Sequence, residues 1–468
     1  MTPDAVIPFS STILRDIVST PEMRAIWSER NLLATWMEVE KASTSAQAEL
    51  GLIPAEAART IIAHLNVETL SPEAIRAQAD RNRHLLVSFL KAFREVCGPA
   101  AEHFHVGPTT QDILDTALTL QIREAHVSLL GQCLKLEEVL CDLALAHHDT
   151  IMMGRTHEQH ALPVTFGLIL ATWATELRDH ITRARESEAR WMYGVLSGGV
   201  GAQNAFVEMS DTDVADKLQQ LFCQKLGLGA PTIDLHPRLD RFAEVVSNLA
   251  SLCSSLGRIG LNLRSWQRPE VLETEAPYGE EEYSSSTMPG KRNPESVERI
   301  EGLASLARCL AQAMQGIPVA DHRDSVRIPV EYVAIPMTYM MTSRALATLI
   351  PACRGLKVHK EQMIHNLDHP NSFGQAVAER LMIAIYKKTG QRDWAHTLLH
   401  DCSQTCYEQG RPLADVVREH PELGKLFDAR ELAELCDLST YTGSASAQTV
   451  RAVRRIRDLR RQDPPTGG

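Results

Sequence analysis

Apolar residues recur with the period of an α-helix over most of the chain. The pattern persists over roughly 20 to 35 residues at a time, well beyond the usual helix of about 11–12 residues. The stretches that show it are residues 111–147, 164–193, 238–266, 295–316 and 327–350. Because long amphipathic helices gain most of their stability by burying an apolar face, the pattern predicts a helical bundle.

A further amphipathic segment covers residues 22–51 and is predicted to end at Gly51, since glycine is the residue type that most often follows a helix. Its apolar stripe consists of Ile26, Trp27, Leu32, Leu33, Trp36, Met37 and Val39. Strand patterns are nearly absent: aromatic residues make up 5% of the chain, and no run of alternating Val, Ile or Thr is bounded by turn residues. The chain is therefore predicted to be all-α.

The length of the chain indicates several domains. Its 468 residues, of which 44% are hydrophobic, are too many for one small core and enough to fill more than one. Glycine- and proline-containing breaks at residues 97–108 and 351–358 suggest an N-terminal helical domain, a central bundle and a C-terminal helical domain. We place these domains at residues 1–106, 107–350 and 351–468.

The charge of the chain limits its partners. A net charge of −11 and a pI near 5.9 argue against nucleic acid or an anionic membrane, because both require a basic face. Small anionic substrates remain possible, since local Arg, Lys and backbone N–H groups recognise them. No signal peptide and no run of about 18 uninterrupted apolar residues is found, so a membrane protein is not expected.

The ten cysteines form no CxxC pair and no Cys/His cluster at zinc spacing. Most lie on apolar helical faces, where cysteine behaves as a small hydrophobic residue. This usage predicts a protein of the reducing cytoplasm.

Three short stretches interrupt the helical pattern with chemically distinctive residues. The first, YSSSTMPGKRNPES at residues 283–296, is predicted to be a loop, because Pro289, Gly290 and Pro294 oppose regular structure. It is unlike a solubilising linker, because a Lys, an Arg and an Asn lie within three residues near an apolar Met. A strongly amphipathic helix follows, so the loop is anchored at a helix start.

The second stretch is HFHVGPTTQD, residues 103–112, in which Gly107 and Pro108 precede a predicted helix. Hydroxyl groups and free N–H groups at a helix start suit a bound carboxylate. The alternative is that Thr110 only caps the helix.

The third stretch is MGRTHEQHALPVTFG, residues 153–167. Its two histidines, His157 and His160, are three residues apart and could ligate zinc, but no third ligand stands at a familiar spacing. No metal site is therefore predicted.

Together these stretches resemble the fumarase/aspartase superfamily. The loop fits the pattern G-S-S-x-M-P-x-K-x-N except that Ser284 replaces the first Gly, and HVGPTTQD resembles H-x-G-x-T-S-x-D. The similarity covers most of the chain and is greatest to the branch holding adenylosuccinate lyase and 3-carboxy-cis,cis-muconate cycloisomerase. It implies three helical domains in a homotetramer around a 20-helix bundle, with each active site built from three subunits.

The resemblance also implies a chemistry. Family members remove a proton beside a carboxylate and expel a group from the next carbon, through an aci-carboxylate intermediate. It assigns Ser285 as the base, Lys291 as a nearby catalytic cation and His157 as the general acid, with no cofactor. It implies substrate binding by His84, His105, Thr109, Thr110, Gln111, Ser286, Asn293 and Arg323. Asn293 could instead cap the helix that follows Pro294.

Differences from adenylosuccinate lyase narrow the range of candidate substrates. Where that enzyme binds a nucleotide phosphate with Ser and Arg, this chain has Ile328 and Tyr332. The cycloisomerases commonly carry Trp at the position of His157. We therefore predict a lyase that releases fumarate from an N-substituted aspartate or nitrosuccinate. Adenylosuccinate lyase, the cycloisomerase and a catalytically inactive scaffold are the alternatives.

Overall fold

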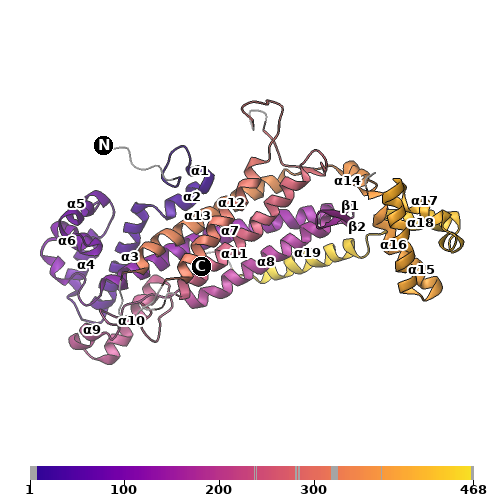
Figure 1. Cartoon of the computed structure of the whole chain (residues 1–468). Coiled ribbons are helices and arrows are strands. Elements are labelled where there is room, and N and C mark those ends of the chain that lie inside the picture. Colours follow the sequence, from indigo (N-terminus) through magenta and orange to yellow (C-terminus); the bar gives the residue numbers. More distant parts are fainter. Residues whose placement is uncertain are drawn as a thin grey trace.

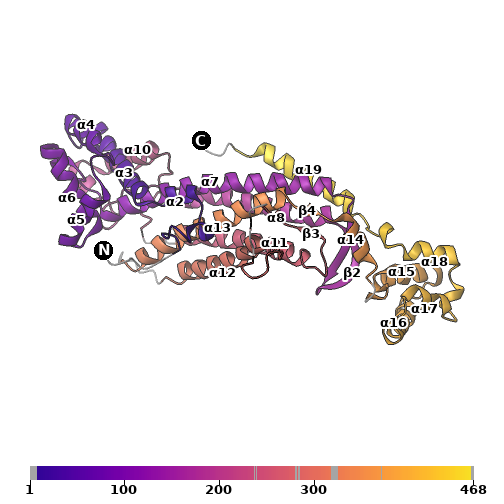
Figure 2. The same cartoon turned by 90° about the horizontal axis from the view of Figure 1, so that it is seen from above.

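The computed structural model is an elongated all-helical molecule with two small β elements (Figures 1 and 2). It describes residues 8–236, 238, 240–279, 282, 285–317, 325–369 and 372–464. Both views show a long bundle in the middle and a cluster of shorter helices at each end. The all-α prediction is confirmed.

Five long helices build the central bundle: α7 (Thr110–Ala146), α8 (Phe166–Trp191), α11 (Asp240–Trp266), α12 (Glu295–Gln315) and α13 (Arg327–Arg354). Each lies within a few residues of a predicted stretch. Their apolar faces form the largest buried core of the molecule. α13 is also long and apolar enough to cross a membrane, but 61% of its most apolar window is buried within the protein.

Shorter helices gather at the N-terminal end of the bundle. They are α1 (Arg15–Val18), α2 (Pro21–Ile26), α3 (Glu29–Glu49), α4 (Ala55–His64), α5 (Pro72–Asn82) and α6 (Leu85–Cys97), joined by α9 (Asn204–Met209) and α10 (Thr212–Leu226). A second core unites α3 to α6 with α10, although α6 ends at Cys97 and α10 begins only at Thr212.

The segment predicted as one helix over residues 22–51 is two helices. α2 ends at Ile26, and Ser28 caps α3 by accepting a hydrogen bond from the Asn31 N–H at 3.2 Å. A serine that caps a new helix can break a continuous apolar stripe without changing its period. The predicted stop is observed: Gly51 follows α3 with a φ of 74°.

The C-terminal end consists of α14 (Lys360–Leu367), α15 (Ala378–Thr389), α16 (Arg392–Gln409), α17 (Leu413–Glu419) and α18 (Ala429–Cys436). These helices surround a third core. The last helix, α19 (Ala445–Gln462), runs back along α8 and α7 (Figures 1 and 2). Asp463, directly after α19, pairs with Arg178 of α8 at 2.8 Å and anchors the chain end to the bundle.

The structure contains a β-hairpin, although the sequence analysis predicted almost no strand. β1 (Ile151–Thr156) and β2 (Gln159–Thr165) pair antiparallel at the far end of α7. The hairpin was not recognised because its turn lacks the Asn-Gly type of signal and because Arg and His interrupt its apolar positions. A smaller pair joins β3 (Thr274–Glu275) to β4 (Lys357–Val358).

Candidate active site

The segment proposed to bind a carboxylate forms the start of α7. Thr109, not Thr110, occupies the N-cap position, and its N–H donates to Asp112 Oδ2 at 2.8 Å. Thr110 and Gln111 make up the first helical turn and are half-buried. Because the first N–H groups of a helix have no partner within it, they can bind an anion here.

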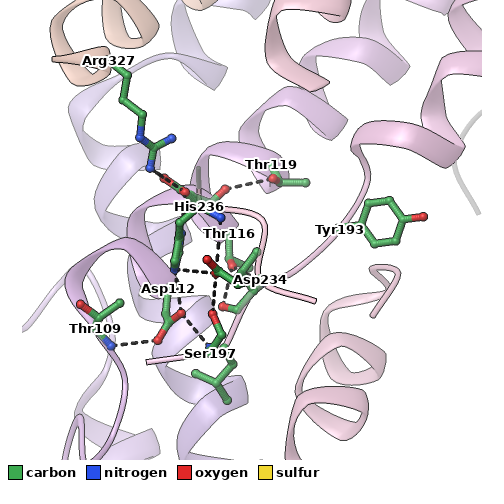
Figure 3. Close-up of polar contacts among 12 residues, drawn as sticks. Thr109, Asp112, Thr116, Thr119, Tyr193, Ser197, Asp234, His236 and Arg327 are labelled. Atoms are coloured by element: carbon green, nitrogen blue, oxygen red, sulfur yellow. Dashed lines mark hydrogen bonds and ion pairs between the residues drawn. The ribbon is translucent and has the colours of Figure 1, made fainter. Parts of the chain in front are cut away.

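Directly behind this turn lies a buried network of charged groups (Figure 3). His236 contacts two carboxylates of α7: Nε2 lies 3.0 Å from Asp112 Oδ1, and Nδ1 lies 2.9 Å from Asp115 Oδ2. Arg327, at the start of α13, donates to both oxygens of Asp115 and to Glu331. The network therefore connects the start of α7 to the start of α13.

Burial and charge shift the pKa values of this network. Burial alone would lower the pKa of His236, but hydrogen bonds and charge from Asp112 and Asp115 raise it from 6.5 to about 9. Burial raises the pKa of Glu331 to about 7, although the nearby Arg327 opposes the shift. The pKa of Asp115 is lowered despite its burial, because His236 and Arg327 both favour its charged form.

These shifts predict that the protein becomes less stable from pH 7 to pH 9. His236 has a raised pKa, so its stabilising contribution is complete below pH 6.5 and is lost as pH rises through about 9. A shift of this size corresponds to about 3 kcal/mol as an upper limit. Glu331 titrates mainly below this window. We expect His236→Gln to flatten the decline, measured by urea unfolding at fixed protein concentration.

The matched control is His180→Gln. His180 is also buried, and burial lowers its pKa to about 4, so it stays neutral throughout this window. The control should keep the wild-type slope. An unchanged slope in His236→Gln would show that His236 is not charged in the folded protein.

His105 is held by a buried carboxylate. Its Nδ1 lies 2.6 Å from Glu40 Oε1, and the Glu40 side chain is fully buried. Burial lowers the pKa of His105, but the charge and hydrogen bond of Glu40 outweigh it, so the pKa is raised. The backbone of His105 is in the left-handed region at φ 57°. His105 is thus fixed just before the start of α7, where it could donate to an anion.

His84 lies elsewhere in the N-terminal helices. It is exposed at the start of α6, where its Nδ1 accepts a hydrogen bond from the Val87 N–H at 3.2 Å. Its observed role is therefore that of a helix cap.

His157 is at the tip of the β1–β2 hairpin. It and Glu158 form the two-residue turn with φ values of 54° and 61°, and both side chains are exposed. Left-handed backbone is uncommon for residues other than glycine, and each such residue costs on the order of 1 kcal/mol. The imidazole of His157 is thus exposed at the hairpin tip.

A polar cavity of about 470 Å³ lies beside this hairpin. His160 lines it together with four further basic side chains, those of Arg155, Arg258, Arg268 and His369. The buried Nδ1 of His160 has no hydrogen-bond partner among the described residues. Burial, with Arg155 and His369, lowers the pKa of His160, so the ring is neutral at pH 7. No group of three or more His, Cys, Asp or Glu suited to a metal occurs in the described part of the chain.

The serine loop precedes α12 and extends away from the bundle (Figure 1). Ser285 is half-buried, and its Oγ accepts a hydrogen bond from the Met288 N–H at 3.0 Å. Ser286 and Lys291 are exposed. α12 begins at Glu295 after Pro294, so Asn293 lies one residue ahead of the N-cap position. Ser284 and Arg323 lie outside the described residues.

Two of the three stretches lie far apart within one chain. Thr110 begins α7, and the hairpin that carries His157 follows the other end of the same helix. With 37 residues, α7 spans about 55 Å at 1.5 Å per residue. A site that uses both segments must therefore take them from different subunits.

Comparison with known proteins identifies the family. Residues 15–308 match the family described as Lyase, and residues 374–452 match Adenylosuccinate lyase C-terminus. The chain belongs to the fumarase/aspartase superfamily.

This lyase is similar over nearly its whole length to named lyases and to solved structures. It is 36% identical to N-acetyl-S-(2-succino)cysteine lyase of Dickeya dadantii, over 93% of this chain and 94% of that protein. It is 35% identical to adenylosuccinate lyase of Methanocaldococcus jannaschii, over 94% of each. Among solved structures, 3-carboxy-cis,cis-muconate lactonizing enzyme from Pseudomonas putida superposes with a TM-score of 0.86 at 30% identity, covering 96% of this chain and 99% of that one.

Sequence reasoning missed the buried partners of this lyase's α7. Asp112 is the last residue of the stretch HFHVGPTTQD, whereas His236, Asp115, Arg327 and Glu331 lie outside all three stretches. Two carboxylates three residues apart in a stretch that is otherwise uncharged from Thr110 to Ile122 were the available signal, because buried charges need partners. The signal indicates that a cation is present but does not identify His236, which lies 121 residues after Asp115.

Proposed function

We propose that this lyase eliminates a substituent from the carbon next to a carboxylate of a substituted succinate and releases fumarate. Support comes from similarity at 35–36% identity, over more than 90% of both chains, to two lyases whose names contain succino or succinate. The sequence motif from Ser285 to Asn293 supports the same chemistry. Ser285 is the proposed base and Lys291 a cation that stabilises the doubly charged carboxylate of the intermediate.

The atom of the leaving group that is bonded to the succinate carbon is proposed to be nitrogen or sulfur. His157 favours an N-substituted aspartate, because an amine is a poor leaving group unless an acid protonates it. Similarity to N-acetyl-S-(2-succino)cysteine lyase supports a thioether of succinate as the second candidate. In either case the substrate is expected to lack a nucleotide phosphate. Ile328 and Tyr332, which stand where the nucleotide enzyme has polar phosphate ligands, are both half-buried on the first turns of α13.

One assay tests the reaction class. Fumarate is incubated with a panel of amines, thiols, hydrazines and nitrite, and loss of its absorbance near 240 nm is followed. Consumption of fumarate with an amine or a thiol is expected. Turnover of 3-carboxymuconate without any fumarate chemistry would overturn the proposal in favour of cycloisomerisation.

We further propose that the active form is a homotetramer with shared active sites. Four copies of the five bundle helices would give the expected twenty. Large apolar side chains are exposed on four of these helices, at Val127, Leu261, Leu306 and Val333, where another subunit could cover them. The separation of Thr110 and His157 at opposite ends of α7 requires such an arrangement if both act on one substrate.

Mixed tetramers test the sharing of sites. Thr110→Ala and Ser285→Ala proteins should each be inactive, because each alters one contribution to every site. After they are denatured and refolded together, roughly a quarter of the sites should contain both native segments by random mixing. The measurement is turnover by the mixture against each variant refolded alone. If verified mixed tetramers regain no activity, both segments act from the same chain.

A further inference from the structure

His236 is completely enclosed, and both of its ring nitrogens face carboxylate oxygens. Its side chain is 1% exposed. Asp115 receives two contacts from Arg327, at 2.6 and 2.7 Å, and is therefore ionised. Asp112 accepts three backbone N–H groups, so both of its oxygens already act as hydrogen-bond acceptors. Because a carboxylate only accepts hydrogen bonds, both nitrogens of His236 must donate, so the ring is an imidazolium.

Asp112 organises the start of α7. Its oxygens accept hydrogen bonds from the N–H groups of Thr109, Ser197 and Gly198 at 2.8 to 2.9 Å. It thereby fixes the helix start to the turn at residues 197–198 (Figure 3). Asp115, one turn further along, is fixed to α13 by Arg327. His236 bridges these two attachments.

The position of Asp112 creates an electrostatic problem for an anionic substrate. It is the third residue of α7, and its negative charge lies behind the helix terminus that is proposed to bind a substrate carboxylate. A negative side chain there would cancel the attraction that the helix terminus exerts on an anion. The cation of His236, 3.0 Å from Asp112, offsets that charge.

Among the described residues, no other cationic side chain forms an ion pair with Asp112. The described charged groups around His236 are the carboxylates of Asp112, Asp115, Asp234 and Glu331 and the guanidinium groups of Arg327 and Arg241. Arg327 is engaged by Asp115 and Glu331, and Arg241 donates to the Tyr193 carbonyl oxygen. Removing the imidazolium would leave the negative charges in excess on the α7 side of the network.

We propose that His236 is a positioning residue of this lyase, which neutralises Asp112 and holds Thr109, Thr110 and Gln111 in the arrangement that binds a substrate carboxylate. This inference rests on the proposed function only for the identity of the anion. The arrangement of the helix start can be measured without any substrate.

The test compares His236→Gln with His180→Gln, the matched buried histidine of α8. Fumarate is the probe, because it is common to every elimination considered, and its dissociation constant is measured by calorimetry. We expect His236→Gln to weaken fumarate binding at least tenfold and to raise KM similarly, while kcat changes less. His180→Gln should leave fumarate binding unchanged. Equal fumarate affinity in both variants would overturn the positioning role.

Hydrogen exchange provides the readout that does not depend on the reaction. Backbone amides of residues 109–116 should exchange faster in His236→Gln and at the wild-type rate in His180→Gln. If wild-type protein neither binds fumarate nor turns over any substituted succinate, the proposed function fails. The exchange result still tests whether His236 holds the start of α7 in place. If wild-type protein is active and exchange is unchanged in His236→Gln, the positioning role fails alone.

Two further variants test the same role if His236→Gln alone does not fold. Asp112→Asn removes the charge that His236 neutralises, and the double variant D112N/H236Q removes both partners together. If neutralisation of Asp112 is the role of His236, losing the histidine in the D112N background should change fumarate affinity less than about threefold. A tenfold or larger change in that background would overturn it.

Discussion

Replacing Ser285 with alanine is expected to lower turnover at least ~10³-fold while fumarate still binds. A loss of that size corresponds to about 4 kcal/mol of transition-state stabilisation. The hydroxyl is a weak base, so its anion needs stabilisation. The Met288 N–H, which donates to Ser285 Oγ at 3.0 Å, provides part of it, because a donor to oxygen favours the anionic form.

The matched control for this variant is Thr287→Ala. Thr287 belongs to the same exposed loop, carries a hydroxyl and has no assigned role. It should retain turnover within a few-fold of wild type, measured by steady-state kinetics beside Ser285→Ala. Near-normal turnover by Ser285→Ala would remove Ser285 from the mechanism, and equal losses in both variants would indicate that the loop acts only as a cover.

The second large effect is expected at His157, where the size of the loss should identify the leaving group. With an amine adduct of fumarate, replacement should cost roughly 10²–10⁴ in turnover, the usual contribution of a positioned general acid. A thioether should lose less, because a thiol with a pKa near 8.5 leaves more readily as an anion. Nitrite leaves without a proton, so nitrosuccinate should lose little.

The structure decides which replacement to use. His157 has a φ of 54°, and asparagine tolerates this left-handed backbone better than alanine does. His157→Asn therefore removes the acid with little change in the turn, and Glu158→Gln is the control at the neighbouring turn position. The three substrates are compared on the same two proteins. Equal losses with all three substrates would show that His157 only orients the succinate portion.

The long helices could be predicted because their signal is periodic and repeated. Each of the five bundle helices shows its apolar stripe over five or more turns, and a threonine or proline occupies the N-cap position of α7, α8 and α12. The break at Ser28 and the hairpin at His157 were missed because each depends on one or two residues. A turn or a cap that depends on one or two residues is hard to recognise when functional side chains occupy the same positions.

The candidate residues were found through motifs, whereas their supporting residues were not. Ser285, His157 and Thr109 lie in short stretches of unusual composition, so they attract attention. His236 lies in an unremarkable sequence and gains its role from contacts with Asp112 and Asp115, more than 100 residues earlier. Long-range pairing of this kind follows from the packing of α7 against the chain near α11, which a sequence pattern does not reveal.

The turn at His157 and Glu158 has a consequence for engineering this lyase. Two residues with side chains occupy backbone that Asn-Gly would adopt at lower cost. A library screened only for thermal tolerance would be expected to select Asn-Gly at these positions and would discard the imidazole. A library screened for turnover would retain the strained pair. The hairpin tip is thus a position where the two selections favour different sequences, and where a more stable variant is expected to be a poorer catalyst.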